Sequence, residues 1–134
     1  MADYQRNIEA ELEQVALAIA KLPQGSLAEL SELELSGVGG ILQSIYNGIE
    51  NILKQLFLAH DKPIPSGLQW HQQVVRQATQ YGFISESTAD ELAPYLTFRH
   101  LYRNAYVLDL RADRMQILID KLEITFSKFK EDVM

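Results

Sequence analysis

The feature that most constrains the fold of this chain is the spacing of its apolar residues, which recur every three or four positions in five separate stretches. This spacing places them on one face of an α-helix. In the first stretch the face consists of Ile8, Leu12, Val15, Ile19 and Leu22. No stretch of useful length alternates apolar and polar residues as a half-buried strand does. The pattern predicts an all-α protein, an antiparallel bundle of about five helices with short connections.

Proline, glycine and capping residues indicate where these helices begin and end. We expect one helix from after Asp3 to near Pro23 and, after the break at 23–26, a second that ends at about His60. Three more are expected over 68–81, from after Ser87 to about Val107, and over 111–132. Pro94 lies inside the fourth span and predicts a kink or a new helix start. At 134 residues, with no repeat or low-complexity tract, the chain is expected to form a single domain over residues 1–134.

Composition narrows the class of protein. The chain has no cysteine, which excludes a disulfide scaffold, a thiolate zinc site and a cysteine nucleophile. Its net charge of −6 makes non-specific coating of DNA a poor expectation. No apolar run approaches the ~20 residues that span a bilayer, and the first residues do not resemble a signal peptide. We therefore expect a soluble cytoplasmic protein without membrane association. The acidic first 34 residues indicate a solvated face or a docking surface for a basic partner.

The segment from Phe98 to Tyr106 carries the most chemistry. On a helix that turns ~100° per residue, its polar residues fall within an arc of roughly 160°, and this side contains no acid. They are Arg99, His100, Arg103, Asn104 and Tyr106. The other side holds Phe98, Leu101, Tyr102 and Ala105. Because guanidinium groups bind phosphate bidentately and imidazole transfers protons near pH 7, the face predicts a site for a nucleotide or RNA phosphate. The alternative is an ordinary solvated face with salt bridges to acids elsewhere.

The same segment resembles the signature of HepT-like proteins in the HEPN superfamily, and other segments agree with this family in the same order. These are Tyr46 to Ile52, Pro65-Ser66-Gly67 followed by Trp70-His71, and Leu108-Asp109-Leu110. The resemblance extends from about Leu30 to Phe129. It implies a helical protein that forms a homodimer in which two copies of an Arg-x4-6-His motif face each other. Many such proteins are metal-independent endoribonucleases that act on RNA.

The resemblance also implies roles for particular residues. HepT-like proteins are toxins neutralised by a nucleotidyltransferase antitoxin of the MNT type, which adds AMP to a tyrosine two residues after the motif histidine. Here the motif arginine is Arg99, the polar residue that follows it is His100, and the AMP acceptor is Tyr106. Arg99 and Arg103 are expected to bind the RNA phosphate.

The sequence departs from the family at one position, because Asn104 stands where the motif histidine falls. An amide does not transfer protons at pH 7, although it can hydrogen-bond a phosphate or a 2′-hydroxyl. Activity then requires that His100 take over the proton transfer, so the expected catalytic set is Arg99, His100 and Asn104. Three functions stay open: an endoribonuclease with reduced activity, a catalytically inactive helical interaction module, and a small-ligand bundle that binds free nucleotides.

The three histidines do not indicate a metal site. The carboxylate-bridged metal bundles use Glu-x-x-His pairs, whereas Phe57, Leu68 and Thr97 precede His60, His71 and His100 by three residues. We expect no metal and no cofactor. Trp70-His71 is interpreted as packing and a capped helix start rather than as part of a catalytic site.

Overall fold

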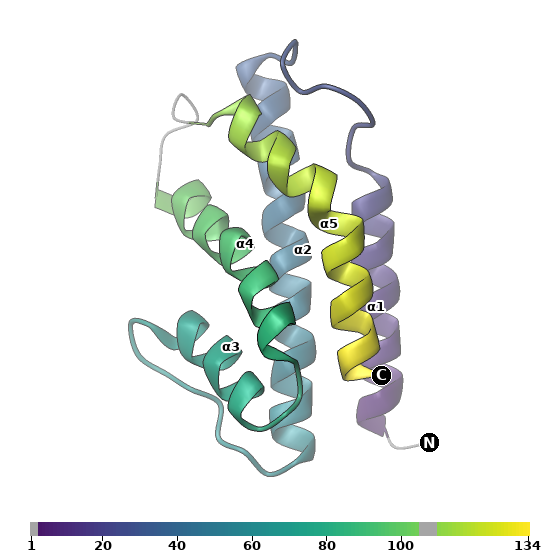
Figure 1. Cartoon of the computed structure of the whole chain (residues 1–134), viewed down its shortest axis with the longest axis vertical. Helices are drawn as coiled ribbons and strands as arrows, with labels where there is room; N and C mark the ends of the chain where they lie inside the picture. The colour runs from purple at the N-terminus through teal and green to yellow at the C-terminus, as the bar shows by residue number, and fades with distance from the viewer. Residues whose placement is uncertain (1–2, 105–109) are drawn as a thin grey trace.

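The computed structural model describes residues 3–104 and 110–134, which form an all-α bundle (Figure 1). Its helices are α1 (Asp3–Ala20), α2 (Glu32–Ala59), α3 (Trp70–Gln80), α4 (Glu86–Asn104) and α5 (Ala112–Val133). In Figure 1, α1 runs antiparallel to α2, and α4 runs antiparallel to α5. The predicted class and helix number are confirmed. In the described ranges, no helix is long and apolar enough to cross a membrane.

The expected helix ends are close to the observed ones, with one informative difference at α4. The sequence indicated a cap at Ser87, but the hydroxyl oxygen of Ser85 accepts the hydrogen bond from the Thr88 backbone N–H at 3.1 Å. The helix therefore begins at Glu86. It continues through Pro94 without a new start.

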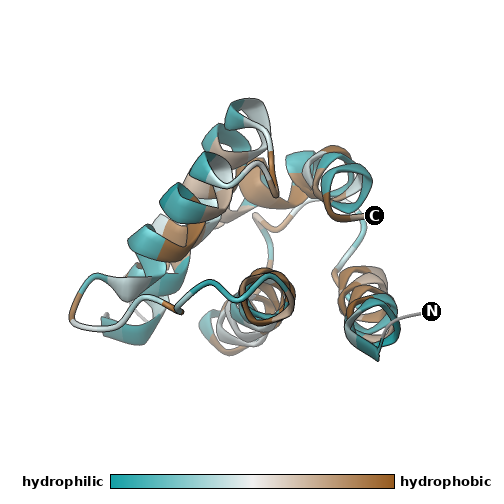
Figure 2. Cartoon of the chain, turned by 90° about the horizontal axis from the view of Figure 1, so that it is seen from below, coloured by the Kyte–Doolittle hydropathy of each residue, from teal (hydrophilic) through white to brown (hydrophobic). Residues whose placement is uncertain are grey.

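Helix α2 is the centre of the bundle, since it packs against α1, α3 and α4. Its long apolar stripe is buried almost throughout, and the largest side chains of the core include its Tyr46 and Phe57. Figure 2 shows hydrophobic residues on the inner sides of the helices and polar ones on the outside. This arrangement explains the helix periods of the sequence, because each helix turns one face to the same core.

Gly48 permits the close approach of α1 and α2. A Cβ atom at this position would lie 2.5 Å from the Cγ2 methyl of Val15, a distance that real side chains do not adopt. By contrast, a Cβ at Gly37 would meet nothing within 4 Å. Gly48 is therefore required by packing against α1, whereas Gly37 is not required by any close contact.

We predict that Gly48→Ala lowers the free energy of unfolding by about 1–2 kcal/mol, because overpacking outweighs the gain in helix propensity. Gly37→Ala is the matched control and is expected to raise it by up to about 1 kcal/mol. Chemical denaturation measures both. Equal stabilisation by the two substitutions would show that α1 moves aside freely.

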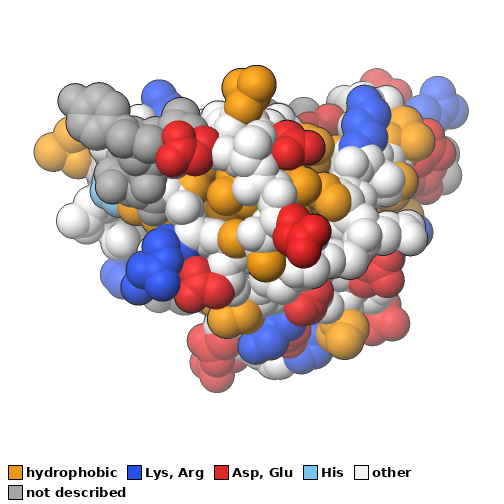
Figure 3. Space-filling view, turned by 90° about the horizontal axis from the view of Figure 1, so that it is seen from above, with side chains coloured by type: hydrophobic (Ala, Val, Ile, Leu, Met, Phe, Trp, Pro, Cys, Tyr) orange, Lys and Arg blue, Asp and Glu red, His pale blue; other side chains and the backbone are white. Residues whose placement is uncertain are grey.

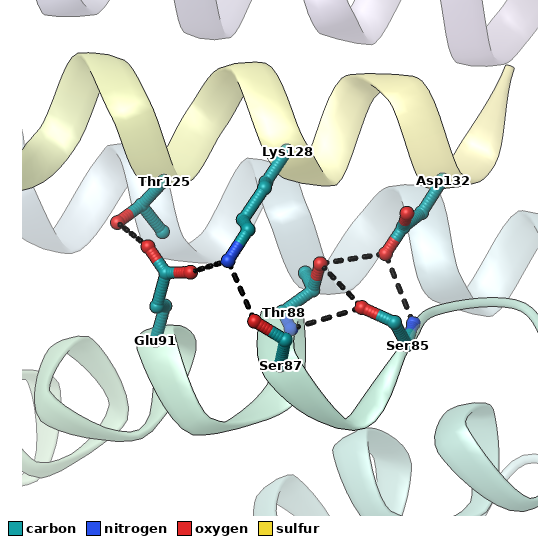
Figure 4. A network of polar contacts seen from close by, with 7 residues as sticks. All are labelled: Ser85, Ser87, Thr88, Glu91, Thr125, Lys128 and Asp132. Atoms are coloured by element: carbon teal, nitrogen blue, oxygen red, sulfur yellow. Dashed lines mark hydrogen bonds and ion pairs between the residues drawn. The ribbon is translucent and has the colours of Figure 1, made fainter.

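A polar network joins the start of α4 to the end of α5 (Figure 4). A carboxylate oxygen of Asp132 accepts hydrogen bonds from the Ser85 backbone N–H at 2.9 Å and the Thr88 hydroxyl at 2.6 Å. Lys128 pairs with Glu91 and donates to the Ser87 hydroxyl. Burial alone would raise the pKa of Asp132, but the hydrogen bonds from Ser85 and Thr88 outweigh it, so the pKa lies below its usual value. The carboxylate thus stabilises the N-terminal end of α4.

We predict that Asp132→Asn lowers the free energy of unfolding near neutral pH by about 1 kcal/mol, a small effect because the site is partly exposed to solvent. The lowered pKa means that this contribution is present above the pKa of the unfolded chain and disappears as the pH falls through that of the folded state. Urea denaturation across acidic pH tests this, with the exposed neighbour Glu131→Gln as control. The same loss in both variants would contradict a specific role of Asp132.

Several acidic side chains of the N-terminal region are exposed to solvent. Glu29, Glu32 and Glu34 are exposed, and Glu34 forms a capping box with Ser31 at the start of α2. Hydrogen bonds from the Ser31 backbone and hydroxyl lower the pKa of Glu34. Figure 3 shows acidic side chains around a group of hydrophobic ones on the end of the molecule where α1 connects to α2.

Candidate functional site

Arg99 points into the bundle rather than along a solvated face. Only 9% of its surface is exposed, and it continues the inward stripe of α4 formed by Thr88, Leu92 and Tyr95. The expected arrangement, with all five polar residues of the 98–106 segment on one outer side, is therefore wrong for Arg99. The physical reason is that the inward stripe starts before this segment, and a helix period counted from Thr88 places Arg99 at its centre.

Uncharged groups from two other helices hold the Arg99 guanidinium. Its Nε donates to the Asn47 side-chain oxygen on α2 at 2.7 Å, and its Nη1 lies 3.2 Å from Nε2 of His71 on α3. None of the ion pairs formed among the described residues includes Arg99. Its positive charge is therefore fixed in place without a carboxylate in direct contact.

His71 links Arg99 to a buried carboxylate. Its Nδ1 lies 2.7 Å from Oε2 of Glu50, whose side chain is 3% exposed. A guanidinium only donates hydrogen bonds, so Nε2 of His71 accepts, and Nδ1–H donates to Glu50. Burial raises the pKa of Glu50, and the hydrogen bond and charge of His71 oppose this rise. The geometry assigns one tautomer to a neutral imidazole, with its lone pair on Nε2.

A cleft of about 680 Å³ lies between α3 and α4 and reaches this network. Its walls carry two guanidinium groups (Arg76 and Arg99), two imidazoles (His71 and His100) and one carboxylate (Asp90). Apolar side chains such as Val75 and Leu96 complete them. The cleft is locally cationic on an acidic protein, which suits an anionic ligand with apolar parts.

Tyr46 also lines the cleft, and its hydroxyl is buried with no hydrogen-bond partner in the part of the chain that the structure describes. Burial and the nearby charge of Glu50 raise its pKa, while Arg99 lowers it, and the hydroxyl stays protonated. A buried O–H without an acceptor is uncommon and costs stability. The group is an unsatisfied donor of a residue in the wall of the cleft.

The structure separates the residues that the sequence grouped together. Arg99 and His100 both line the cleft, whereas Arg103 and Asn104 are exposed and not among its lining residues. The Asn104 side-chain N–H donates to the backbone oxygen of His100 at 2.8 Å, so the amide is turned toward its own helix. Tyr106 lies outside the described residues.

The sequence interpretation missed Glu50, Asn47 and Tyr46, and it treated His71 as packing and helix capping. Helix α3 does begin at Trp70, but His71 is engaged by Glu50 and Arg99, and Gln69 makes no side-chain capping bond. A signal was present, because the segments 46–52 and 70–71 both belong to the family resemblance. Considering only residues 3–104 and 110–134, the structure gathers no group of three or more His, Asp or Glu side chains that would hold a metal ion.

These features define a helical bundle with a buried arginine at the floor of a cationic cleft. Compared with known families, the chain matches the family model described as HepT-like protein over residues 37–134. It therefore belongs to the HepT-like family of the HEPN superfamily, as the resemblance indicated. No curated protein and no solved structure matches it.

We predict that Tyr46→Phe does not destabilise the free protein and raises its free energy of unfolding by up to about 1–3 kcal/mol, because it removes an unsatisfied buried hydroxyl. Thermal and urea denaturation measure this change. Tyr95→Phe is the matched control, since the Tyr95 hydroxyl donates to the Leu118 backbone oxygen at 2.6 Å and its loss should destabilise. Destabilisation by Tyr46→Phe comparable to that of the control would mean that the hydroxyl has a partner after all.

Proposed function

We propose that this HepT-like protein binds RNA, with a backbone phosphate held by Arg99 at the floor of the cleft between α3 and α4. The observation that carries the proposal is the state of Arg99, which is buried and fixed by Asn47 and His71 with no carboxylate partner in the described ranges. A guanidinium ordered in advance loses little freedom when a phosphate arrives.

The surroundings of Arg99 support a phosphate better than a carboxylate or a neutral ligand. The unpaired Tyr46 hydroxyl offers a second donor, and Arg76 adds a further positive charge to the wall. His100 lies on the exposed side of the cleft. Several donors around one cleft match the non-bridging oxygens of a phosphodiester, whereas the apolar walls suit ribose and base.

The biological setting that we propose is a toxin–antitoxin pair, in which this chain is the RNase-toxin-type component and an MNT-type nucleotidyltransferase is its antitoxin. Family membership supports this setting. Addition of AMP to Tyr106, two residues after Asn104, would place a bulky anionic group beside the RNA-binding helix. This modification is part of the proposal.

A homodimer is proposed on the same family basis. On α4 a symmetric contact cannot use Leu92, because this side chain is fully buried. Leu96 is half-buried, Leu101 is exposed, and Val107 lies outside the described residues. The outer side of α4 around Leu101 therefore replaces the Leu92 side in the proposed contact.

We predict that Arg99→Ala weakens binding of single-stranded RNA by about 10–100-fold, the loss expected for a charge-assisted contact to phosphate. The slope of log affinity against log salt should fall by about 0.7, one phosphate contact on a single strand. Fluorescence anisotropy with a labelled RNA oligonucleotide measures both quantities.

Arg6→Ala on α1 is the matched control, because it removes one exposed positive charge and should leave the affinity nearly unchanged. Arg99→Lys keeps the positive charge but lacks the planar guanidinium group that reaches both Asn47 and His71. It therefore tests whether a buried charge alone is enough for binding in a folded protein. Circular dichroism verifies that each variant is folded. Equal RNA affinity of folded Arg99→Ala and the unaltered protein would refute the proposal.

A further inference from the structure

His71 stands beside Arg99 in a geometry that the proposed RNA site does not itself require. Glu50, His71 and Arg99 come from α2, α3 and α4 and form a continuous chain of hydrogen bonds. Glu50 fixes the ring through Nδ1, and the Trp70 ring lies 3.6 Å from the imidazole centroid. The side chain of His71 is 19% exposed, and it lines the cleft. The imidazole is thus held by Glu50 and Arg99, and part of the ring is exposed in the cleft.

We propose that His71, oriented by Glu50, is the proton acceptor for cleavage of bound RNA, the task that an amide at position 104 does not perform. This inference rests on the proposed RNA-binding function and assigns its chemistry to a residue outside the 98–106 segment.

Phosphate binding at Arg99 would also free the lone pair on Nε2 of His71, the proposed proton acceptor. In the free protein the His71 lone pair accepts from Arg99 Nη1 at 3.2 Å. A phosphate oxygen that takes over this hydrogen bond leaves Nε2 unoccupied next to the bound phosphate. Because Nδ1 stays bonded to Glu50, the ring keeps its orientation, and the carboxylate stabilises the imidazolium that forms.

The reaction is a transesterification within the RNA chain. The 2′-oxygen forms a bond to the adjacent phosphorus as its proton passes to Nε2 of His71, and the bond from phosphorus to the 5′-oxygen breaks. A water molecule protonates the leaving 5′-oxygen, and the hydroxide that results takes the proton from His71. The products are a 2′,3′-cyclic phosphate and a 5′-hydroxyl. Arg99 and the Tyr46 hydroxyl stabilise the negative charge on the phosphoryl oxygens.

His100 is the natural comparison, because both imidazoles line the same cleft. It is exposed, and the contact that its ring makes in the described structure is a long one of 3.4 Å to the Asn104 amide. No carboxylate of the described residues is paired with it. A base needs a fixed orientation and a set tautomer, and His71 has both.

The test uses the full chain, a 5′-labelled RNA oligonucleotide and the same oligonucleotide with 2′-O-methyl groups, which lack the proton to be removed. We expect His71→Gln to lower the cleavage rate by 10²–10⁴-fold, the range for loss of a general base, with unchanged affinity for the 2′-O-methyl RNA. Glutamine can still donate to Glu50 and accept from Arg99, so the fold should persist. His60→Gln, which removes an exposed imidazole outside the cleft, is the control and should retain the rate.

The pH profile distinguishes proton transfer from mere support of Arg99. Cleavage by the unaltered protein should decline on the acidic side, because only an unprotonated imidazole accepts a proton, and this decline should vanish in the residual activity of His71→Gln. Glu50 and Arg99 contact His71 directly. The other titratable or charged groups around it are Tyr46, Arg76, Asp90 and His100, which line the same cleft, and Lys54, which lies over the Trp70 ring.

Two results would overturn the assignment while leaving RNA binding intact. One is full activity of His71→Gln. The other is cleavage that appears only when Asn104→His restores an imidazole at position 104. If Arg99→Ala binds the 2′-O-methyl RNA as tightly as the unaltered protein does, the proposed RNA-binding function itself is refuted. Failure of the proton-acceptor assignment and failure of the proposed function are therefore distinguishable.

Discussion

The burial of one guanidinium among three helices is the constraint on which the candidate site depends. Arg99 sits in the inward stripe of α4, where most helices place an aliphatic side chain. A buried charge is tolerated only when it is well hydrogen-bonded. Asn47 and His71 supply these bonds, and Glu50 in turn fixes His71. The relative positions of α2, α3 and α4 are therefore tied to the polar network as much as to apolar contacts.

Much of the fold was accessible from the sequence because it is determined locally. The spacing of apolar residues and the capping residues located all five helices, since the apolar spacing within an amphipathic helix shows which of its faces is buried. The exception at Ser85 has a simple cause. Ser85 and Ser87 both satisfy the sequence rule for a cap, and the choice depends on Asp132, which approaches from α5. A contact 47 residues away in the chain is not encoded in the local pattern.

The candidate site was harder to predict from the sequence, because it too depends on contacts between residues that are far apart in the chain. A helical wheel for residues 98–106 treats polarity as exposure, and this fails where a polar side chain has partners inside the protein. Arg99 can be buried because it hydrogen-bonds to Asn47, 52 residues earlier, and to His71, 28 residues earlier. The family resemblance contained the three segments that meet there, but their juxtaposition follows only from the packing of α3 between the ends of α2 and α4.

The position of Asn104 shows why a change there is compatible with an intact fold. Its amide bonds to the His100 backbone oxygen in the last turn of α4, so the side chain is engaged with its own helix. An imidazole or an amide at this exposed place makes little difference to the core. The Glu50–His71–Arg99 chain has the opposite character, because removing any member leaves a buried polar group without its partner. Proton transfer based on this chain would depend on the folded bundle itself, because its three members come from α2, α3 and α4.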